Sequence, residues 1–129
     1  MSATPEEVVR QNLVLRMLQL GYPKHLISIE KNLRDLAPLS QEDVPYRRVD
    51  IVCFSKKKMT PLLMVECKAI DLNKNVIYQV IGYNQFVQSS FIAIANAEKI
   101  LTGWYDKEEN QYRFIETLPS YEQLVNALL

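Results

Sequence analysis

The chain has no excess of charge of either sign. Its 129 residues include 15 lysines and arginines and 15 aspartates and glutamates, so the formal net charge at pH 7 is zero. This balance argues against a protein that holds nucleic acid by bulk charge alone. Any contact with nucleic acid should therefore be local.

Signals for membranes and export are also missing. No apolar run approaches the roughly 20 residues that span a bilayer, and the N-terminus lacks the basic and apolar regions of a signal peptide. We therefore expect a cytoplasmic protein with no membrane contact. Repeats and low-complexity tracts are absent too, so residues 1–129 are predicted to form a single domain with a sizeable core.

The familiar signatures of zinc and nucleotide sites are absent as well. The two cysteines, Cys53 and Cys67, have neither zinc-ligand spacing nor a paired histidine. Both fall in apolar runs, which predicts buried reduced thiols. No Gly-x-x-x-x-Gly-Lys loop is present to hold nucleotide phosphates. His25, the single histidine, falls in a turn and is expected to be exposed.

Two strand-like runs, residues 49–54 and 62–67, stand out because each contains an acid. The short lysine-rich segment between them predicts a hairpin. Strand side chains alternate between faces, so Glu66 and Lys68 share one face. Hairpin pairing brings Asp50 beside the end of the second run. We therefore expect these three side chains to converge.

Two interpretations of this convergence are open. Charges on core strands are costly to bury unless they are paired or bound to a metal. Asp50 and Glu66 could form ion pairs with Lys68 or Arg48. Alternatively, the two carboxylates supply hard oxygen ligands for magnesium or manganese, and Lys68 orients a water or stabilises a pentavalent phosphate. The combination of residue types favours the metal site.

The pattern of Asp50, fifteen residues and then Glu66-Cys67-Lys68 resembles the Asp…Glu-x-Lys signature of the PD-(D/E)xK nuclease superfamily. Val49 stands where the superfamily name has proline. Three further segments resemble the N-terminal nuclease domain of type I restriction enzyme R subunits. They are residues 4–11, Gly21-Tyr22-Pro23, and Gln79-x-x-x-Tyr83. The resemblance covers nearly the whole chain.

This resemblance implies a metal-dependent deoxyribonuclease that hydrolyses DNA phosphodiester bonds with Mg²⁺ or Mn²⁺. Asp50 and Glu66 would bind the metal, with the Cys67 backbone carbonyl as a further ligand. Lys68 would activate the attacking water and Gln79 would orient the metal site or a phosphate. Tyr83 would contact the DNA backbone, although a place in the core is an equal alternative.

The first helix of this superfamily often lends a glutamate to the metal, and here Glu6 and Glu7 are both available. Glu7 also fits a capping box with Thr4, so the sequence does not decide between the two acids.

Further DNA contacts are expected to be local, and partner subunits are expected to be other chains. The candidate DNA-binding residues outside the central cluster are Arg47, Arg48, Lys56, Lys57 and Lys58. The three lysines fit a solvated turn equally well. R subunits carry a helicase motor after this module; here the motor is expected to be absent or on another chain. Helicase or specificity subunits on other chains are candidate partners. Aromatic residues around Trp104 are candidates for a homodimer interface.

An alternative function is a catalytically silent nuclease-fold module for DNA binding or protein assembly, with its acids used as ion pairs. The sequence leaves open DNA against RNA, endonuclease against exonuclease action, and any site preference.

The predicted fold is α/β and restriction-endonuclease-like, with a central mixed sheet flanked by helices and an added edge hairpin. A helix begins at Pro5, after a Thr4 cap, and ends at Gly21. The remaining predicted elements are strands at residues 26–30, 49–54, 62–67 and 91–95, a helix at 76–88, a hairpin of residues 99–105 and 111–116, and a terminal helix that starts at residues 119–120.

Overall fold

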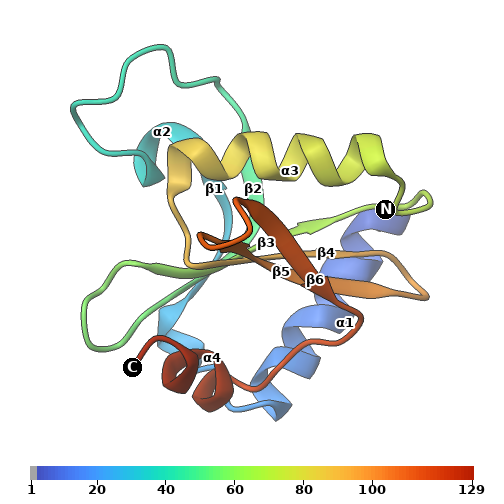
Figure 1. Ribbon diagram of the computed structural model, residues 1–129. Coiled ribbons are helices and arrows are strands. Elements are labelled where there is room, and N and C mark those ends of the chain that lie inside the picture. Colours follow the sequence, from blue (N-terminus) through green and yellow to red (C-terminus); the bar gives the residue numbers. More distant parts are fainter. Residues whose placement is uncertain (1–2) are drawn as a thin grey trace.

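A six-stranded sheet forms the centre of the molecule, and its strands lie side by side in chain order (Figure 1). The computed structural model describes residues 3–129. The strands are β1 (Ile27–Asn32), β2 (Arg48–Phe54), β3 (Pro61–Cys67), β4 (Phe91–Ala95), β5 (Ile100–Asp106) and β6 (Gln111–Ile115). The helices are α1 (Pro5–Gln19), α2 (Leu33–Leu36), α3 (Lys74–Val87) and α4 (Tyr121–Ala127), with a 3-10 turn η1 (Lys24–Leu26).

The sheet is mixed because one of its connections crosses over. β3 and β4 pair in parallel, whereas the other neighbouring strands pair antiparallel. The chain between β3 and β4 forms α3, as a parallel connection requires. The predicted fold class is therefore confirmed, including the edge hairpin of β5 and β6.

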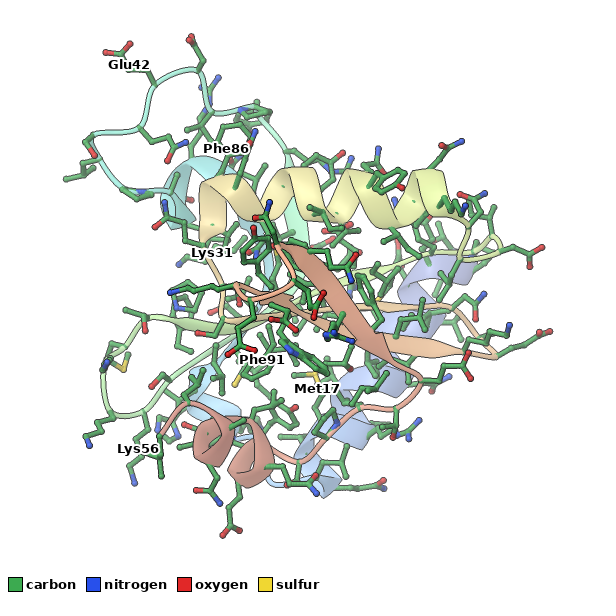
Figure 2. All side chains as sticks on the ribbon, viewed as in Figure 1. Met17, Lys31, Glu42, Lys56, Phe86 and Phe91 are labelled. Atoms are coloured by element: carbon green, nitrogen blue, oxygen red, sulfur yellow. The ribbon has the colours of Figure 1, made fainter. Side chains whose placement is uncertain are left out.

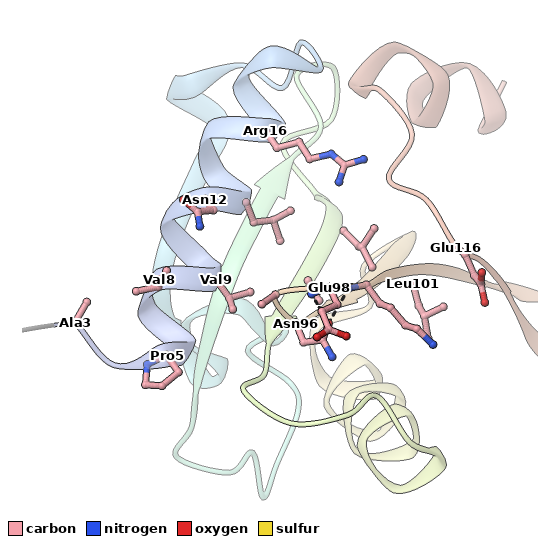
Figure 3. A pocket seen from close by; sticks show the side chains of 15 residues that line it. Ala3, Pro5, Val8, Val9, Asn12, Arg16, Asn96, Glu98, Leu101 and Glu116 are labelled. Atoms are coloured by element: carbon pink, nitrogen blue, oxygen red, sulfur yellow. Dashed lines mark hydrogen bonds between the residues drawn. The ribbon is translucent and has the colours of Figure 1, made fainter.

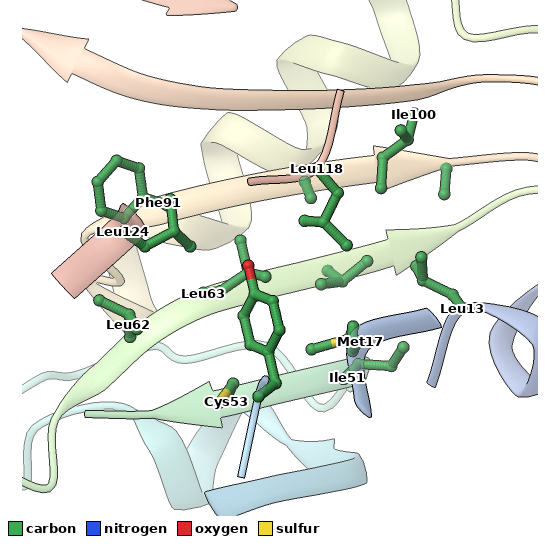
Figure 4. Close-up of a cluster of buried hydrophobic side chains, with 14 of the residues drawn as sticks. Leu13, Met17, Ile51, Cys53, Leu62, Leu63, Phe91, Ile100, Leu118 and Leu124 are labelled. Carbon is green, nitrogen blue, oxygen red and sulfur yellow. The ribbon is translucent and has the colours of Figure 1, made fainter. Parts of the chain in front are cut away.

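Helices cover both faces of the sheet. In Figure 1, α3 lies along one face, while α1 and α4 lie on the other. The α1 face buries Met17 and Leu124 against Ile51, Leu63 and Phe91 of the strands (Figure 4). The α3 face buries a second cluster, whose members are Leu33, Val49, Val52, Met64, Val76, Val80, Val87, Ile92 and Ile94. Burial on both faces explains the almost continuous apolar runs of β3 and β4.

The first helix has the predicted boundaries, but its cap is simpler. Thr4 Oγ1 accepts a hydrogen bond from the Glu7 amide at 3.2 Å, and Gly21 adopts a φ of 84° just after the helix. The return bond from the Glu7 side chain is not formed, so the predicted capping box is wrong in its second half. The Glu7 side chain is therefore not committed to the cap.

One helix boundary differs from the prediction, and one short helix is additional. α3 begins at Lys74 instead of residue 76, because the Asn73 side chain accepts a hydrogen bond from Val76 N at 3.0 Å and caps the helix there. The short α2 was not predicted, and it follows β1 directly. Its cap is Asn32, whose side chain accepts a bond from Arg34 N.

Aromatic residues of the edge hairpin pack on one another both across its two strands and along β6. Tyr105 and Tyr112 meet edge to face at 5.6 Å between ring centroids, and Tyr112 stacks on Phe114. Trp104 is half-buried against the α1-face cluster. A homodimer through Trp104 stays a prediction. Among residues 3–129, no helix combines the length and apolar character that a bilayer crossing requires.

Two glycines offer a matched test of this packing. A Cβ at Gly103 of β5 would run into the ring of Phe114 on β6, whereas a Cβ at Gly82, inside α3, meets open space. We expect Gly103→Ala to lower the free energy of unfolding by about 1–3 kcal/mol. Gly82→Ala should raise it by about 0.5–1 kcal/mol. Urea unfolding measures both, and equal effects of the two variants would contradict the packing.

Candidate active site

The two acidic strands separate at the point where their acids lie. The backbone pairing of β2 with β3 ends at Ile51 and Val65. Beyond it, Asp50 Oδ2 accepts a hydrogen bond from Cys67 N at 2.7 Å, and Asp50 N donates to Glu66 Oε1 at 3.4 Å. Side-chain oxygens thus take the place of backbone partners. Both carboxylates are held at this end of the hairpin, as the sequence predicted.

Glu66 is a buried carboxylate with unusual proton affinity. It is 2 % exposed, and burial is the main cause that raises its pKa to about 7. The charge of Asp50 raises this pKa further, while Arg47, Lys68 and the hydrogen bond from the Asp50 amide lower it. Two neighbouring carboxyl groups that are shielded from water favour the binding of a cation.

Lys68 lies on the same face as Glu66 and reaches α3. Its backbone amide donates to Ala95 O at 2.8 Å, which keeps it aligned with the end of β4. Its Nζ donates to Gln79 Oε1 at 3.3 Å. The structure therefore brings Lys68 and Gln79 together at the acidic pair, where the sequence placed them.

Tyr83 is half-buried, and its contact with DNA stays a prediction. Its ring packs against the cluster under α3, and the guanidinium carbon of Arg47 lies 4.5 Å from the ring centroid. Arg47 Nη2 also lies 3.4 Å from Glu66 Oε2. Sequence reasoning identified Arg47 as a DNA-binding candidate but missed this contact, because Arg47 and Tyr83 meet only through tertiary packing.

The other basic candidates do not join this cluster. Lys56, Lys57 and Lys58 follow the far end of β2, whose last residue, Phe54, is about 13 Å of strand from Asp50. Figure 2 shows Lys56 near α4, on the opposite side of the sheet from α3, and its amide donates to Tyr121 Oη at 2.9 Å. Arg48 is exposed and lies opposite Asn32 at the sheet edge. DNA binding by these four residues stays a prediction.

The available donors suit a hard divalent cation that keeps part of its water shell. They are the Asp50 and Glu66 carboxylates and the Cys67 carbonyl at the end of β3. Within residues 3–129, no three His, Cys, Asp or Glu side chains gather as a metal would require. Neither Glu6 nor Glu7 therefore completes the pair in this structure.

Glu6 nevertheless lies close enough for its charge to act on the Cys67 thiol. Burial, followed by the charges of Asp50 and Glu66, raises the pKa of Cys67 to about 12; Arg10 lowers it and Glu6 adds a smaller increase. Both cysteines are free and buried, as predicted. A metal ligand from α1 stays a prediction.

Asn96 supports the loop that follows Lys68, and sequence reasoning missed it. Its side-chain nitrogen donates to Ile70 O at 3.1 Å, while its side-chain oxygen accepts from Glu98 N and Lys99 N. An asparagine just after a buried strand is typical of such a turn, which was the available signal.

A separate hollow of about 740 Å³ lies between α1 and the β4–β5 turn (Figure 3). Its lining includes Asn12, Arg16, Glu98 and Glu116. Its lining carries charges of both signs, so it indicates no particular class of ligand.

The mixed sheet with an acidic pair and a lysine at the end of its central hairpin defines a restriction-endonuclease-like α/β domain. The model of the family described as type I restriction enzyme R protein N terminus (HSDR_N) matches residues 5–119. The chain belongs to this family.

One solved structure extends the comparison. It is a fragment from Vibrio vulnificus YJ016, assigned as an HsdR subunit of a type I restriction enzyme. The alignment has a TM-score of 0.64 and 16 % identity, and it covers 95 % of this chain. The chain spans 24 % of that fragment. No curated protein matches the chain.

The raised pKa of Glu66 predicts a particular pH dependence of stability. Between about pH 4.5 and 7 the unfolded chain loses the Glu66 proton while the folded chain keeps it, so stability falls as pH rises. Glutamine does not titrate, so the Glu66→Gln variant lacks this loss. We expect its free energy of unfolding, relative to that of the wild type, to rise by on the order of 2 kcal/mol when the pH is raised from 5 to 8. Urea unfolding with a chelator present measures this difference.

The exposed Glu122 of α4 supplies the control for this series. The free energy of unfolding of Glu122→Gln should change with pH in parallel with that of the wild type. If Glu66→Gln also runs parallel to wild type, Glu66 does not hold its proton in the folded protein.

Proposed function

We propose that this domain hydrolyses phosphodiester bonds of DNA with a divalent cation held by Asp50 and Glu66. The observation that carries the proposal is the end of the β2–β3 hairpin, where the two carboxylates meet and Lys68 lies on the same face. Membership in a family of type I restriction R proteins supports the choice of substrate.

The carboxylates and the Cys67 carbonyl would hold Mg²⁺ or Mn²⁺. The bound cation would supply charge stabilisation for the phosphate and polarisation of a water. The protein keeps the two carboxylates in place before any cation arrives, because Asp50 is anchored by the Cys67 amide and Glu66 is buried. Little reorganisation is then needed on binding.

Lys68 would orient the attacking water and stabilise the charge that develops on the phosphate. Its ammonium has three donors, and Gln79 Oε1 takes one of them at 3.3 Å. The remaining donors are free to reach a water or a phosphate oxygen. Gln79 is thus a positioning residue, since it holds Lys68 beside the acids.

DNA recognition would depend on backbone shape and on other subunits. The formal net charge is zero, and within residues 3–129 the basic side chains that act on Glu66 are those of Arg47 and Lys68. Phosphate contacts position a protein on DNA, whereas sequence is read at base edges. A restriction-type assembly would supply the motor and specificity functions.

The Arg47–Glu66 contact favours a second candidate function. It forms an ion pair on a carboxylate that is almost fully buried. In a catalytically silent module, this pair and the Asp50–Cys67 bond would serve only to hold the strand ends together, and the domain would act in DNA binding or assembly.

Calorimetric titration with Mn²⁺ separates the two functions. The nuclease proposal expects one site in the wild type, with affinity at least tenfold weaker in Glu66→Gln and in Asp50→Asn, because each change removes a carboxylate ligand. The exposed Glu122→Gln should bind as wild type. A wild type without a site, or variants that bind equally well, would favour the silent module.

Lys68→Met tests the role of the lysine in the reaction. Methionine keeps much of the length but removes the charge, so Mn²⁺ binding should persist while cleavage of plasmid DNA falls by about 10²-fold or more. Lys107→Met, in the exposed β5–β6 turn, is the control and should retain wild-type cleavage. Full cleavage by Lys68→Met would remove the lysine from the mechanism.

A further inference from the structure

Arg47 lies directly against the carboxylate that is proposed to bind the metal. It precedes β2, and its backbone carbonyl accepts a hydrogen bond from Leu33 N at 2.8 Å. Its Nη2 is 3.4 Å from Glu66 Oε2, and its guanidinium carbon lies 4.5 Å from the Tyr83 ring centroid. The guanidinium therefore sits between an acidic ligand and an aromatic face.

This contact uses only part of what the arginine can donate. Charge-assisted bonds are usually about 2.7–2.9 Å long, so the 3.4 Å contact with Glu66 is loose. Arg47 Nε is buried and has no hydrogen-bond partner within residues 3–129. A guanidinium normally presents paired donors to a carboxylate or phosphate. Arg47 has one such donor unused beside the acidic pair.

A divalent cation and Arg47 would compete for the same carboxylate. Both are positive and both draw on Glu66, so binding of the cation would weaken the Arg47–Glu66 contact by repulsion. Tyr83 would still hold the flat face of the guanidinium. The released arginine would then remain next to the site with its donors unsatisfied.

We propose that Arg47 exchanges its partner during the reaction cycle: it covers Glu66 in the metal-free protein and transfers to a phosphate of the DNA strand when a divalent cation binds. The inference rests on the proposed function. It adds that Arg47 binds a phosphate of the DNA and that, while no metal is bound, it pairs with the buried carboxylate of Glu66. The phosphate oxygens supply the paired acceptors that Glu66 does not. Tyr83 is then the platform for Arg47.

The first arm of the test is Mn²⁺ binding without DNA. Arg47→Gln removes the competing charge, so we expect its affinity for Mn²⁺ in calorimetry to rise at least threefold above wild type. Arg48→Gln is a matched control, since it changes the neighbouring exposed arginine, and it should bind as wild type. Thermal unfolding of each variant checks the fold, and Arg47→Lys supplies a second variant that keeps the charge.

The second arm measures the binding of a short DNA duplex by fluorescence anisotropy, with Ca²⁺ present as the divalent cation. Arg47→Gln should bind DNA at least threefold more weakly than wild type, and Arg47→Lys should not restore the affinity because it lacks the planar fork. Arg48→Gln should lose less DNA affinity than Arg47→Gln does. Tighter Mn²⁺ binding combined with weaker DNA binding by Arg47→Gln supports the exchange.

The contrary outcomes are distinguishable. If Mn²⁺ binds wild type and is lost in Glu66→Gln, but Arg47→Gln shows no gain, the exchange is overturned and the metal site stands. If Arg47→Gln gains Mn²⁺ affinity without losing DNA affinity, the transfer to phosphate is overturned. If neither wild type nor Arg47→Gln binds Mn²⁺, the exchange and the proposed function both fail.

Discussion

The hydrogen bond from the Cys67 amide to Asp50 is the interaction on which the site depends. Cys67 is buried, so its amide needs a partner once β2 no longer supplies one. The Asp50 carboxylate takes that place at 2.7 Å. The bond completes the end of the sheet and also points Asp50 toward β3, beside Glu66. A backbone requirement thus fixes the spacing of the two acids.

Burial then sets the electrostatics. Glu66 is withdrawn from water in a sheet whose neighbouring residues are apolar, which raises its pKa to about 7. Arg47 and Lys68 offset this cost from two sides. Structural ion pairs and functional sites both perturb pKa values. The Lys68–Gln79 contact favours function here, because it holds a charged amine beside the acids through a neutral, exposed partner on α3.

Local periodicity explains what the sequence could predict. The alternation of side chains along β3 predicted that Glu66 and Lys68 share one face, and hairpin pairing predicted that Asp50 lies beside them. Gln79 reaches the same face from α3, where it accepts a hydrogen bond from Lys68 Nζ. The Arg47–Tyr83 contact depends on how distant segments pack, so no local pattern predicted it. The three hairpin lysines share only their charge with Arg47 and Arg48, the other candidates for DNA binding, and β2 separates the two groups.

The balance of charges connects the site to its proposed setting. A domain with a formal net charge of zero gains little from the release of counterions along DNA, which normally supplies much of the affinity. Its positive groups at the site are few and are already engaged with Glu66 and Gln79. Under the proposed function, such a domain acts efficiently only when another part of an assembly holds the DNA against it. The chemistry can then be governed locally, by the competition between a cation and Arg47 for one buried carboxylate.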